Sequence, residues 1–351
     1  MDQMNKTIIQ DALIEAFAQF QLKKIIKNEL LKAINEVNAD DIEWITVRGN
    51  HIPLKKGESK EKQIKEFFDS KKKDSSKSSE DNKADYDYIL KQVKENNAKT
   101  YSMNDIFELL KNDSSFKGSI DELKKKIDEA ETYNSKIETT DKRYSDKNGF
   151  YTGREAIHKG IINKIFKNAK DARPEKGKKP TFIFLGGRGG SGKSKFDGLV
   201  YNRKDYIVLD ADAIKEMLPE YKGFNAFEVH EESSHILNKA LEKAQKRGLN
   251  VVLDATMKTK KSAENKIKSF QKLGYNIEMY YMHLPREKAA SRAFGRFMGE
   301  RGRYVPFSEL MKMKDNEQNF DELKKYASKW AFYNNDVPTK EDEPILVKKN
   351  Y

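Results

Sequence analysis

Residues 182–194 read Phe-Ile-Phe-Leu-Gly-Gly-Arg-Gly-Gly-Ser-Gly-Lys-Ser. The first four residues form a short apolar strand, and the last eight match the phosphate-binding pattern G-x-x-x-x-G-K-[ST]. That pattern requires a helix directly after it, and we expect one that runs through Phe196 and Leu199. Glycines leave no Cβ between the backbone N–H groups and the phosphate oxygens. Strand, loop and helix together predict a nucleotide-binding loop, which a chance glycine-rich turn explains less well.

The predicted contacts of this loop with ATP are Gly187, Arg188, Gly189, Gly190, Ser191, Gly192, Lys193 and Ser194. We expect Lys193 to reach the β- and γ-phosphates and Ser194 to ligate Mg²⁺. The positive end of the following helix would attract the phosphates further. The loop thus predicts nucleotide binding and leaves open which group accepts a phosphate.

Short apolar strands alternate with amphipathic helices over the second half of the chain. The strands are predicted at residues 181–185, 206–209, 250–253, 277–282 and 345–347, and helices at 227–247, 259–273 and 286–298. Strands that are almost wholly apolar indicate a parallel sheet that is buried on both faces. We therefore predict an α/β fold: a P-loop NTPase-type parallel sheet flanked by helices.

Acidic residues follow two of these strands. Asp210 and Asp212 come after the second strand, and Asp254 ends the third, two residues before Thr256. Ligands of open α/β sheets lie at the carboxyl ends of the strands. Asp212 is therefore a candidate general base, with a helix N-cap as the alternative. Asp254 is a candidate Mg²⁺ ligand, with a plain strand-to-loop turn as the alternative.

Arginines gather after the fourth predicted strand. Arg292 and Arg296 lie four residues apart on one helix face, and Arg301 and Arg303 follow. Arginines on a mobile segment can stabilise the charge of a phosphoryl group in transfer. The alternative is a solvated basic face. We favour the catalytic role for Arg296 and Arg303, and the solvated face for Arg292 and Arg301.

The first half of the chain is predicted to be mostly helical with a short β-hairpin. We expect four segments: a helical region with the hairpin (1–68), a flexible Ser/Lys/Asp linker (69–85), a second helical region (86–140) and the P-loop domain (141–351). The hairpin is predicted from the β-branched run 42–47 and the return strand 51–54.

Composition restricts the class of protein. The 351 residues include 68 Lys and Arg, 56 Asp and Glu and no cysteine, which gives a net charge of +12. A disulfide framework, a cysteine-ligated zinc site and a thiol nucleophile are excluded. No signal peptide or membrane-spanning stretch is evident, so we expect a cytoplasmic protein without membrane contact. The charge favours an anionic partner, although codon bias toward lysine explains it equally well.

Residues 151–336 resemble the kinase domain of zeta toxins. The resemblance is carried by residues 184–194, 209–212, 229–234 and 252–256, and by Arg296 and Arg303 with the residues that follow to Pro306. Zeta toxins are bacterial toxin–antitoxin kinases that transfer the ATP γ-phosphate to the 3′-hydroxyl of UDP-N-acetylglucosamine. The resemblance implies that Asp212 is the general base, that Lys193 and Ser194 bind ATP and Mg²⁺, and that the two arginines clamp the phosphates.

The resemblance also implies a sugar-nucleotide site at His230, Glu231, Ser233 and Thr256. The chain departs from the family pattern at Arg188-Gly189, where many members have Gln-Pro, and after the third strand. Two other readings stay open: a P-loop kinase acting on a nucleic-acid end or another small hydroxyl compound, and a nucleotide-gated binding module. Nucleic acid is a less favoured partner. An antitoxin, or cis-inhibition by the N-terminal region, is a further expectation.

Overall fold

The computed structural model describes residues 42–47, 50–55, 59, 79–113, 115–167, 169–299, 302–337 and 342–351. The chain divides into two compact units, Met1–Lys77 and Ser78–Tyr351. In the first unit, β1 (Ile42–Val47) pairs antiparallel with β2 (Asn50–Lys55), which confirms the predicted hairpin. The predicted N-terminal helices and residues 69–78 of the predicted linker lie outside the described residues.

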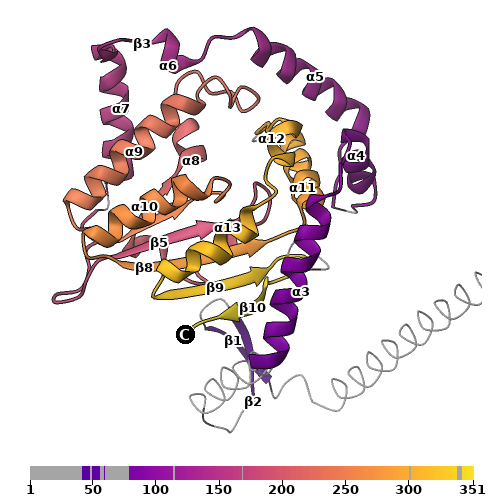
Figure 1. Ribbon diagram of the computed structural model, residues 1–351, viewed down its shortest axis with the longest axis vertical. Helices are drawn as coiled ribbons and strands as arrows, with labels where there is room; N and C mark the ends of the chain where they lie inside the picture. Colours follow the sequence, from indigo (N-terminus) through magenta and orange to yellow (C-terminus); the bar gives the residue numbers. More distant parts are fainter. Residues whose placement is uncertain are drawn as a thin grey trace, which may run out of the picture. The chain divides into compact units, whose positions relative to one another are not determined.

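A six-stranded sheet in the order β10-β9-β8-β5-β7-β6 is the centre of the second unit (Figure 1). Its strands are β5 (Thr181–Gly186), β6 (Ile207–Asp210), β7 (Val251–Asp254), β8 (Asn276–His283), β9 (Lys329–Asn334) and β10 (Ile345–Lys349). Strands β5 to β9 are mutually parallel, which confirms the α/β class. Strand β9 was not predicted, and β10 runs antiparallel to it because only the short segment 335–344 joins the two.

Helices surround the sheet, with short elements between them. They are α3 (Ser79–Asn97), α4 (Met103–Lys111), α5 (Ile120–Lys136), α6 (Thr140–Arg143), α7 (Thr152–Ile165), α8 (Ala211–Lys215), α9 (His230–Lys246), α10 (Lys260–Lys272), α11 (Arg286–Met298), α12 (Phe307–Met311) and α13 (Asn316–Leu323). The short elements are the hairpin of β3 (Ser145–Asp146) and β4 (Gly149–Phe150) and the 3₁₀ turns η2 (Lys193–Phe196), η3 (Arg203–Asp205) and η4 (Lys324–Tyr326).

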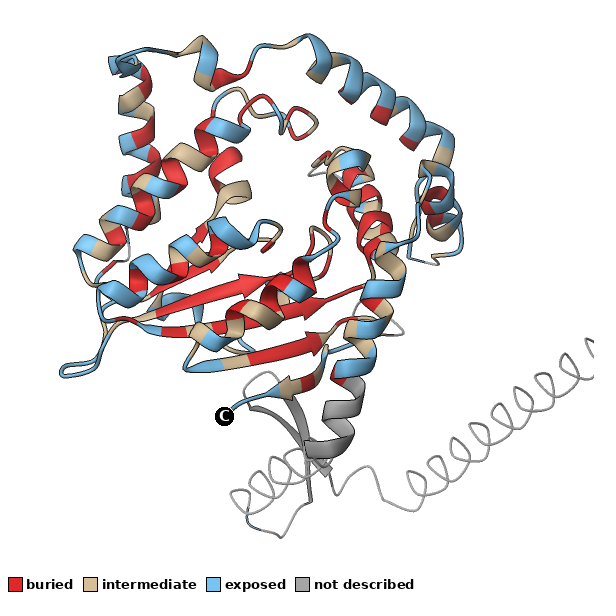
Figure 2. Cartoon of the chain, viewed as in Figure 1, coloured by how far each residue is buried: buried red, intermediate tan, exposed pale blue. Residues whose placement is uncertain are grey.

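The sheet is buried on both faces, as its apolar strands predict (Figure 2). Phe182 and Phe184 of β5 belong to a cluster with apolar residues of α7, α9, α10 and α13. Ile183 and Leu185 point the other way, into a cluster with Phe196 of η2 and the segment 200–206. Among the described residues, this segment rather than a long helix covers β5 on that face.

The helix expected after the P-loop is the main error in the prediction. Only the four-residue turn η2 forms, and Asp197 after it is extended (φ −65°, ψ 123°). Gly198 then takes φ +83°, a backbone conformation that cannot continue a helix. Leu199, through which the helix was expected to run, is 40 % exposed. The argument from a helix dipole therefore does not apply to this loop.

Helices α4 and α5 belong to the same compact unit as the sheet. Ile106, Leu110 and Leu123 share one apolar cluster with Phe294 and Phe297 of α11. This differs from the predicted boundary near residue 140, because α4 and α5 have their apolar stripes against α11 rather than against a core of their own. Helix α3 begins at Ser79, so it occupies the end of the predicted linker.

Leu110→Ala tests whether this helical region is integral to the unit. Leu110 is 1 % exposed, so its truncation leaves a cavity and we expect a loss of about 2–5 kcal/mol in unfolding free energy. Urea unfolding followed by far-UV circular dichroism measures it, with the exposed neighbour Lys111→Ala as control. A main transition unchanged in the Leu110 variant would show that α4 is a separate folding unit.

Candidate functional site

The P-loop connects β5 to η2, and three of its glycines, among them Gly187 (φ +142°), have backbone conformations that other residues rarely adopt. Gly190 and Gly192 both have φ +89°. A Cβ at Gly190 would overlap the backbone oxygen of Ala289 at the start of α11, and one at Gly192 would overlap the side-chain amide of Asn335. That amide donates a hydrogen bond to the backbone oxygen of Ser191 (2.7 Å). The loop is thus fixed by close contacts with α11 and with the residue that follows β9.

Lys193 folds back over the loop. Its Nζ donates hydrogen bonds to the backbone oxygens of Gly187 (2.9 Å) and Arg188 (3.3 Å) and lies 3.5 Å from Oδ1 of Asp254. The ammonium group is therefore held where the loop backbone and the end of β7 meet. A phosphate oxygen entering the loop would find this cation already in place.

A cleft of about 470 Å³ opens beside the loop. It brings together residues from the P-loop, two strand ends and the arginine segment: Gly189, Gly190, Gly192, Lys193, Ser194, Asp210, Asp212, Asp254, Arg292, Gly295, Arg296 and Arg303. Four of its side chains are cationic and three are acidic, so the lining carries a positive excess that suits an anionic ligand. All the residues predicted for catalysis and for metal binding line this one cleft.

The three carboxylates have different partners. Asp210 and Asp254 are register neighbours at the ends of β6 and β7. Asp210 is the N-cap of α8, because its Oδ1 accepts a hydrogen bond from the backbone N–H of Asp212 (2.8 Å). The capping role considered for Asp212 thus belongs to Asp210. The Asp212 carboxylate instead lies between Lys215 Nζ (3.1 Å) and Arg303 Nη1 (2.6 Å).

These partners set opposite pKa shifts. Burial raises the pKa of Asp254 to about 6 against the opposing effect of Lys193, with Asp210 adding to the rise. Burial and the charge of Asp212 likewise raise the pKa of Asp210. Burial would also raise the pKa of Asp212, but Lys215 and Arg303 outweigh it and hold that pKa below its ordinary value. Asp212 is therefore the carboxylate of the three that stays charged most firmly.

Arg292, Arg296 and Arg303 line the same cleft as the loop. Nη1 of Arg303 binds Asp212, while its Nε is buried and has no hydrogen-bond partner. Burial and the charge of Arg303 lower the pKa of Arg296, which makes no ion pair within the described residues. Arg292, for which a solvated face was favoured, also lines the cleft and donates to the backbone oxygen of Asn335 (3.4 Å). Arg301 lies outside the described residues.

The residues predicted for the sugar nucleotide do not line this cleft. His230 and Glu231 are exposed in the first turn of α9. Partial burial, and then the charge of Lys215, lower the pKa of His230. Ser233 is buried and its Oγ donates to the backbone oxygen of His230 (2.7 Å). Thr256 Oγ1 accepts a hydrogen bond from the backbone N–H of Lys258 (3.3 Å).

The side chain of Arg188 points away from the cleft. It forms a buried ion pair with Glu317 of α13 and donates to the backbone oxygens of Met313 (2.8 Å) and Leu284 (3.2 Å). Glu317 is also 2.8 Å from Nδ1 of His283. Among the predicted ATP contacts, Arg188 is therefore not one of the residues that line the cleft, and its side chain fixes the loop to α13.

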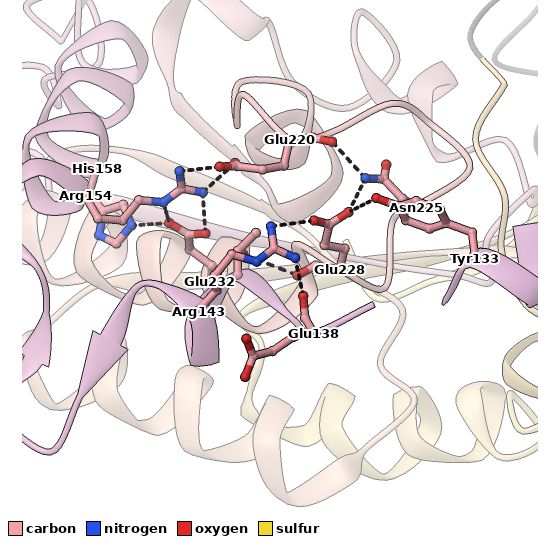
Figure 3. A network of polar contacts seen from close by, with 10 residues as sticks. Tyr133, Glu138, Arg143, Arg154, His158, Glu220, Asn225, Glu228 and Glu232 are labelled. Atoms are coloured by element: carbon pink, nitrogen blue, oxygen red, sulfur yellow. Dashed lines mark hydrogen bonds and ion pairs between the residues drawn. The ribbon is translucent and has the colours of Figure 1, made fainter. Parts of the chain in front are cut away.

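A second buried network was not predicted (Figure 3). Glu232 of α9 binds Arg154 Nε (2.5 Å) and His158 Nε2 (2.6 Å), both from α7, and Arg154 also binds Glu220 (2.6 Å). Glu228 accepts hydrogen bonds from other residues beside it in Figure 3, including Asn225 Nδ2 (2.6 Å). The network fixes the segment between α8 and α9. His158 thus has a structural role, as a buried partner of Glu232.

We expect this network to make the fold sensitive to acid. Burial would raise the pKa of Glu232, but hydrogen bonds from His158 and Arg154 lower it to about 2. A carboxylate whose pKa is lowered by folding stabilises the fold fully above its unfolded pKa of about 4.3, and this stabilisation disappears as the pH falls to about 2. Urea midpoints at pH 7, 5 and 3 measure it. Glu232→Gln should flatten the fall below pH 5, and equal slopes for both proteins would contradict the assignment.

Fold and cleft define a class: a nucleotide-binding P-loop phosphotransferase, with a carboxylate and arginines facing the loop. The family model "Zeta toxin" matches residues 163–338, half of the chain. The chain therefore belongs to the zeta toxin family and is an ATP-dependent kinase. No curated protein sequence matches it significantly.

Solved structures with a similar arrangement have low identity. One, of the PezAT chromosomal toxin–antitoxin system of Streptococcus pneumoniae, is 15 % identical with a TM-score of 0.41, covering 57 % of this chain and 81 % of that chain. Another, AvrRxo1-ORF1:-ORF2 with ATP, is 14 % identical with a TM-score of 0.47, covering 61 % and 77 %. In the described part of the chain, no helix has the length and apolar character to cross a membrane.

Proposed function

We propose that the chain transfers the γ-phosphate of ATP to the 3′-hydroxyl of UDP-N-acetylglucosamine and acts as a toxin in this way. One observation carries the proposal. Asp212 is a charged carboxylate held by Lys215 and Arg303 in the same cleft as the P-loop lysine. In a kinase site, such a carboxylate accepts the proton of the attacking hydroxyl.

The loop side of the cleft suits ATP with a divalent cation. Ser194 and Asp254 provide a hydroxyl and a carboxylate oxygen in one cleft, the hard oxygen ligands that Mg²⁺ prefers. The described residues contain no group of three or more His, Cys, Asp or Glu that could hold a metal by themselves. This fits Mg²⁺, which binds through one or two carboxylates together with the phosphates. When bound, the cation neutralises charge on the phosphates.

The side chains of the cleft account for each bond and proton in the proposed phosphoryl transfer. The 3′-hydroxyl oxygen forms a bond to the γ-phosphorus while its proton passes to Asp212, and the bond from the γ-phosphorus to the bridging oxygen of ADP breaks. Lys193, Arg296 and Arg303 stabilise the negative charge of the transferring group. Arg303 offers its unpartnered Nε to a phosphate oxygen while Nη1 holds Asp212.

The acceptor is expected at the side of Asp212 that faces α9. In this proposal His230, Glu231 and Ser233 at the start of α9, together with Thr256, form the sugar-nucleotide side of the site. His230 is supported by its electrostatic coupling to Lys215 and Asp212. Ser233 supports the site indirectly, because its hydroxyl closes the first turn of α9.

An acceptor screen tests the proposal. The full chain is incubated with ATP and Mg²⁺ and with either UDP-N-acetylglucosamine or a 5′-hydroxyl oligonucleotide, and products are identified by mass spectrometry. We expect one phosphate added to the sugar nucleotide, with Asp212→Asn as the inactive control. If only the oligonucleotide were phosphorylated, a nucleic-acid end would replace the sugar nucleotide as the acceptor. If the chain bound ATP but phosphorylated neither compound, both proposed acceptors would be wrong.

Cis-inhibition is tested by a deletion whose end the structure defines. The second unit begins at Ser78 and α3 at Ser79, so a deletion to residue 85 would remove the start of this helix. Deleting residues 1–77 should leave the second unit intact. If residues 1–77 inhibit the kinase, we expect higher phosphotransfer and toxicity in the deletion than in the full chain. Equal values would exclude cis-inhibition and leave a separate antitoxin as the expected regulator.

A further inference from the structure

The edge of the sheet opposite the candidate site is strongly basic. Strands β5 to β9 are parallel, so the residues that precede each of them lie at one edge. The five residues before each of these five strands include ten basic side chains and one acidic side chain, Asp205. The five residues after each strand, at the edge with the cleft, include five basic and three acidic side chains. Most of the excess charge therefore lies away from the ATP site.

Eight of these ten cations are exposed and make no ion pair within the described residues: Lys176, Lys179, Arg203, Lys204, Lys246, Arg247, Lys272 and Lys325. The other two have acidic neighbours, since Lys178 binds Glu175 (2.6 Å) and Lys324 binds Asp321. Surface lysines commonly pair with nearby carboxylates, whereas one or two of these unpaired cations precede each of the five parallel strands and Asp205 is the one acidic residue among them, so the edge keeps a positive excess. We name these ten residues the basic edge.

An exposed aromatic residue lies at the same edge. Strand β10 runs antiparallel to β9, so its end is beside the start of β9. Tyr351 follows it and is 53 % exposed, with Lys349 Nζ at 5.0 Å and Lys329 Nζ at 6.0 Å from its ring centroid. In Figure 1 the C-terminus and the loop that precedes β5 both lie on the left, and Figure 2 shows that loop as exposed.

We infer that the basic edge binds single-stranded nucleic acid. Neighbouring strands lie about 4.8 Å apart, so the cations that precede the five strands extend over roughly 19 Å from β9 to β6. A phosphate backbone can follow such a row, while Tyr351 offers a face on which a base can stack. Single-strand binding surfaces combine these two features, a cationic track and exposed aromatic rings. Leu273, 56 % exposed, also lies at this edge, so a membrane surface is the alternative that the vesicle measurement below tests.

This surface is separate from phosphotransfer. The basic edge precedes the strands, whereas the P-loop, Asp212 and the arginines follow them. Binding of nucleic acid is therefore expected with or without ATP, and the inference does not depend on the acceptor of the kinase.

The test is fluorescence anisotropy with labelled 20-nucleotide oligouridylate RNA and the matching DNA, at 50–200 mM NaCl, on the full chain. The variant of the basic edge is Lys179→Glu/Arg203→Glu/Lys246→Glu. The control, Lys124→Glu/Lys125→Glu/Lys126→Glu in α5, makes the same change in net charge at a distance from the basic edge in sequence. We expect the wild type to bind and its affinity to fall as the salt concentration rises. The edge variant should bind at least tenfold more weakly. The slope of log affinity against log salt should also be smaller by about 2 in that variant, because each of the three lost phosphate contacts accounts for about 0.7. The control should stay within about threefold of wild type.

Tyr351→Ala separates stacking from charge and leaves the charge unchanged. We expect it to bind about tenfold more weakly with little change in salt slope. Circular dichroism confirms that all variants are folded. The inference is wrong if wild type does not bind either oligonucleotide at 50 mM NaCl, or if the edge and α5 variants lose affinity equally. The inference would also be wrong if the wild type bound phosphatidylserine vesicles but neither oligonucleotide, and the edge variant lost this vesicle binding. The surface would then be assigned to membranes.

Discussion

Asp212→Asn should lower phosphotransfer by about 10²–10⁴-fold, the range for loss of a positioned general base. The substitution keeps the size of the side chain and removes the charge that Lys215 and Arg303 hold in place. ATP affinity should change much less, because Asp212 is not among the expected nucleotide ligands. Initial rates of phosphorylated-acceptor formation measure the first effect and calorimetric titration with ATP the second.

Asp128→Asn on the exposed side of α5 is the matched control, since it removes one carboxylate outside the cleft. It should retain full activity. The unfolding midpoint of Asp212→Asn must also be recorded, because Lys215 is buried and loses its partner. A folded Asp212→Asn protein with activity within threefold of wild type would remove Asp212 from catalysis, and Asp210 would become the next candidate.

Arg188→Met should destabilise the fold by about 3–5 kcal/mol, the usual cost of breaking a buried ion pair. Arg188 is 3 % exposed and its guanidinium binds the Glu317 carboxylate, which is itself fully buried. Burial would raise the pKa of Glu317, but Arg188 and His283 hold it at about 2. Methionine removes the charge that compensates this carboxylate, and urea unfolding measures the loss.

Two further variants separate a structural role from a nucleotide contact. Arg188→Met/Glu317→Gln removes both charges and should recover part of the lost stability. Arg203→Met, an exposed arginine before β6, should change unfolding by less than about 0.5 kcal/mol. Weaker ATP binding by Arg188→Met with unchanged stability would contradict the structural role and support a direct contact with the nucleotide.

The catalytic side of the cleft was predictable because its residues stand at the ends of recognisable strands. The glycine-rich loop follows an apolar run, and Asp210 and Asp254 end two others, so parallel pairing alone brings them together. Sequence reasoning did not assign Asp210 to the site, although its position at a strand end was the available signal. Strand β9 was missed, although its Trp-Ala-Phe-Tyr run carries the apolar signal of a buried strand.

The buried ion pairs were not predictable from local patterns. Arg154 and Glu232 are far apart in sequence, and so are Arg188 and Glu317, and nothing beside either arginine marks its partner. The position of Arg188 inside the P-loop favoured a phosphate contact, but packing against α13 decided its direction. The four-residue turn after the loop was also unpredictable from apolar spacing, because the extended backbone of Asp197 ends it and the positive φ of Gly198 prevents a longer helix.

The crystal structure of the full chain with Mg²⁺ and a non-hydrolysable ATP analogue tests the central claim most directly. The account predicts that the β- and γ-phosphates lie in the loop 187–194 within hydrogen-bond reach of Lys193, that the cation contacts Ser194, and that Asp212 and Arg303 face the γ-phosphate. A nucleotide bound elsewhere, or a γ-phosphate pointing away from Asp212, would contradict it.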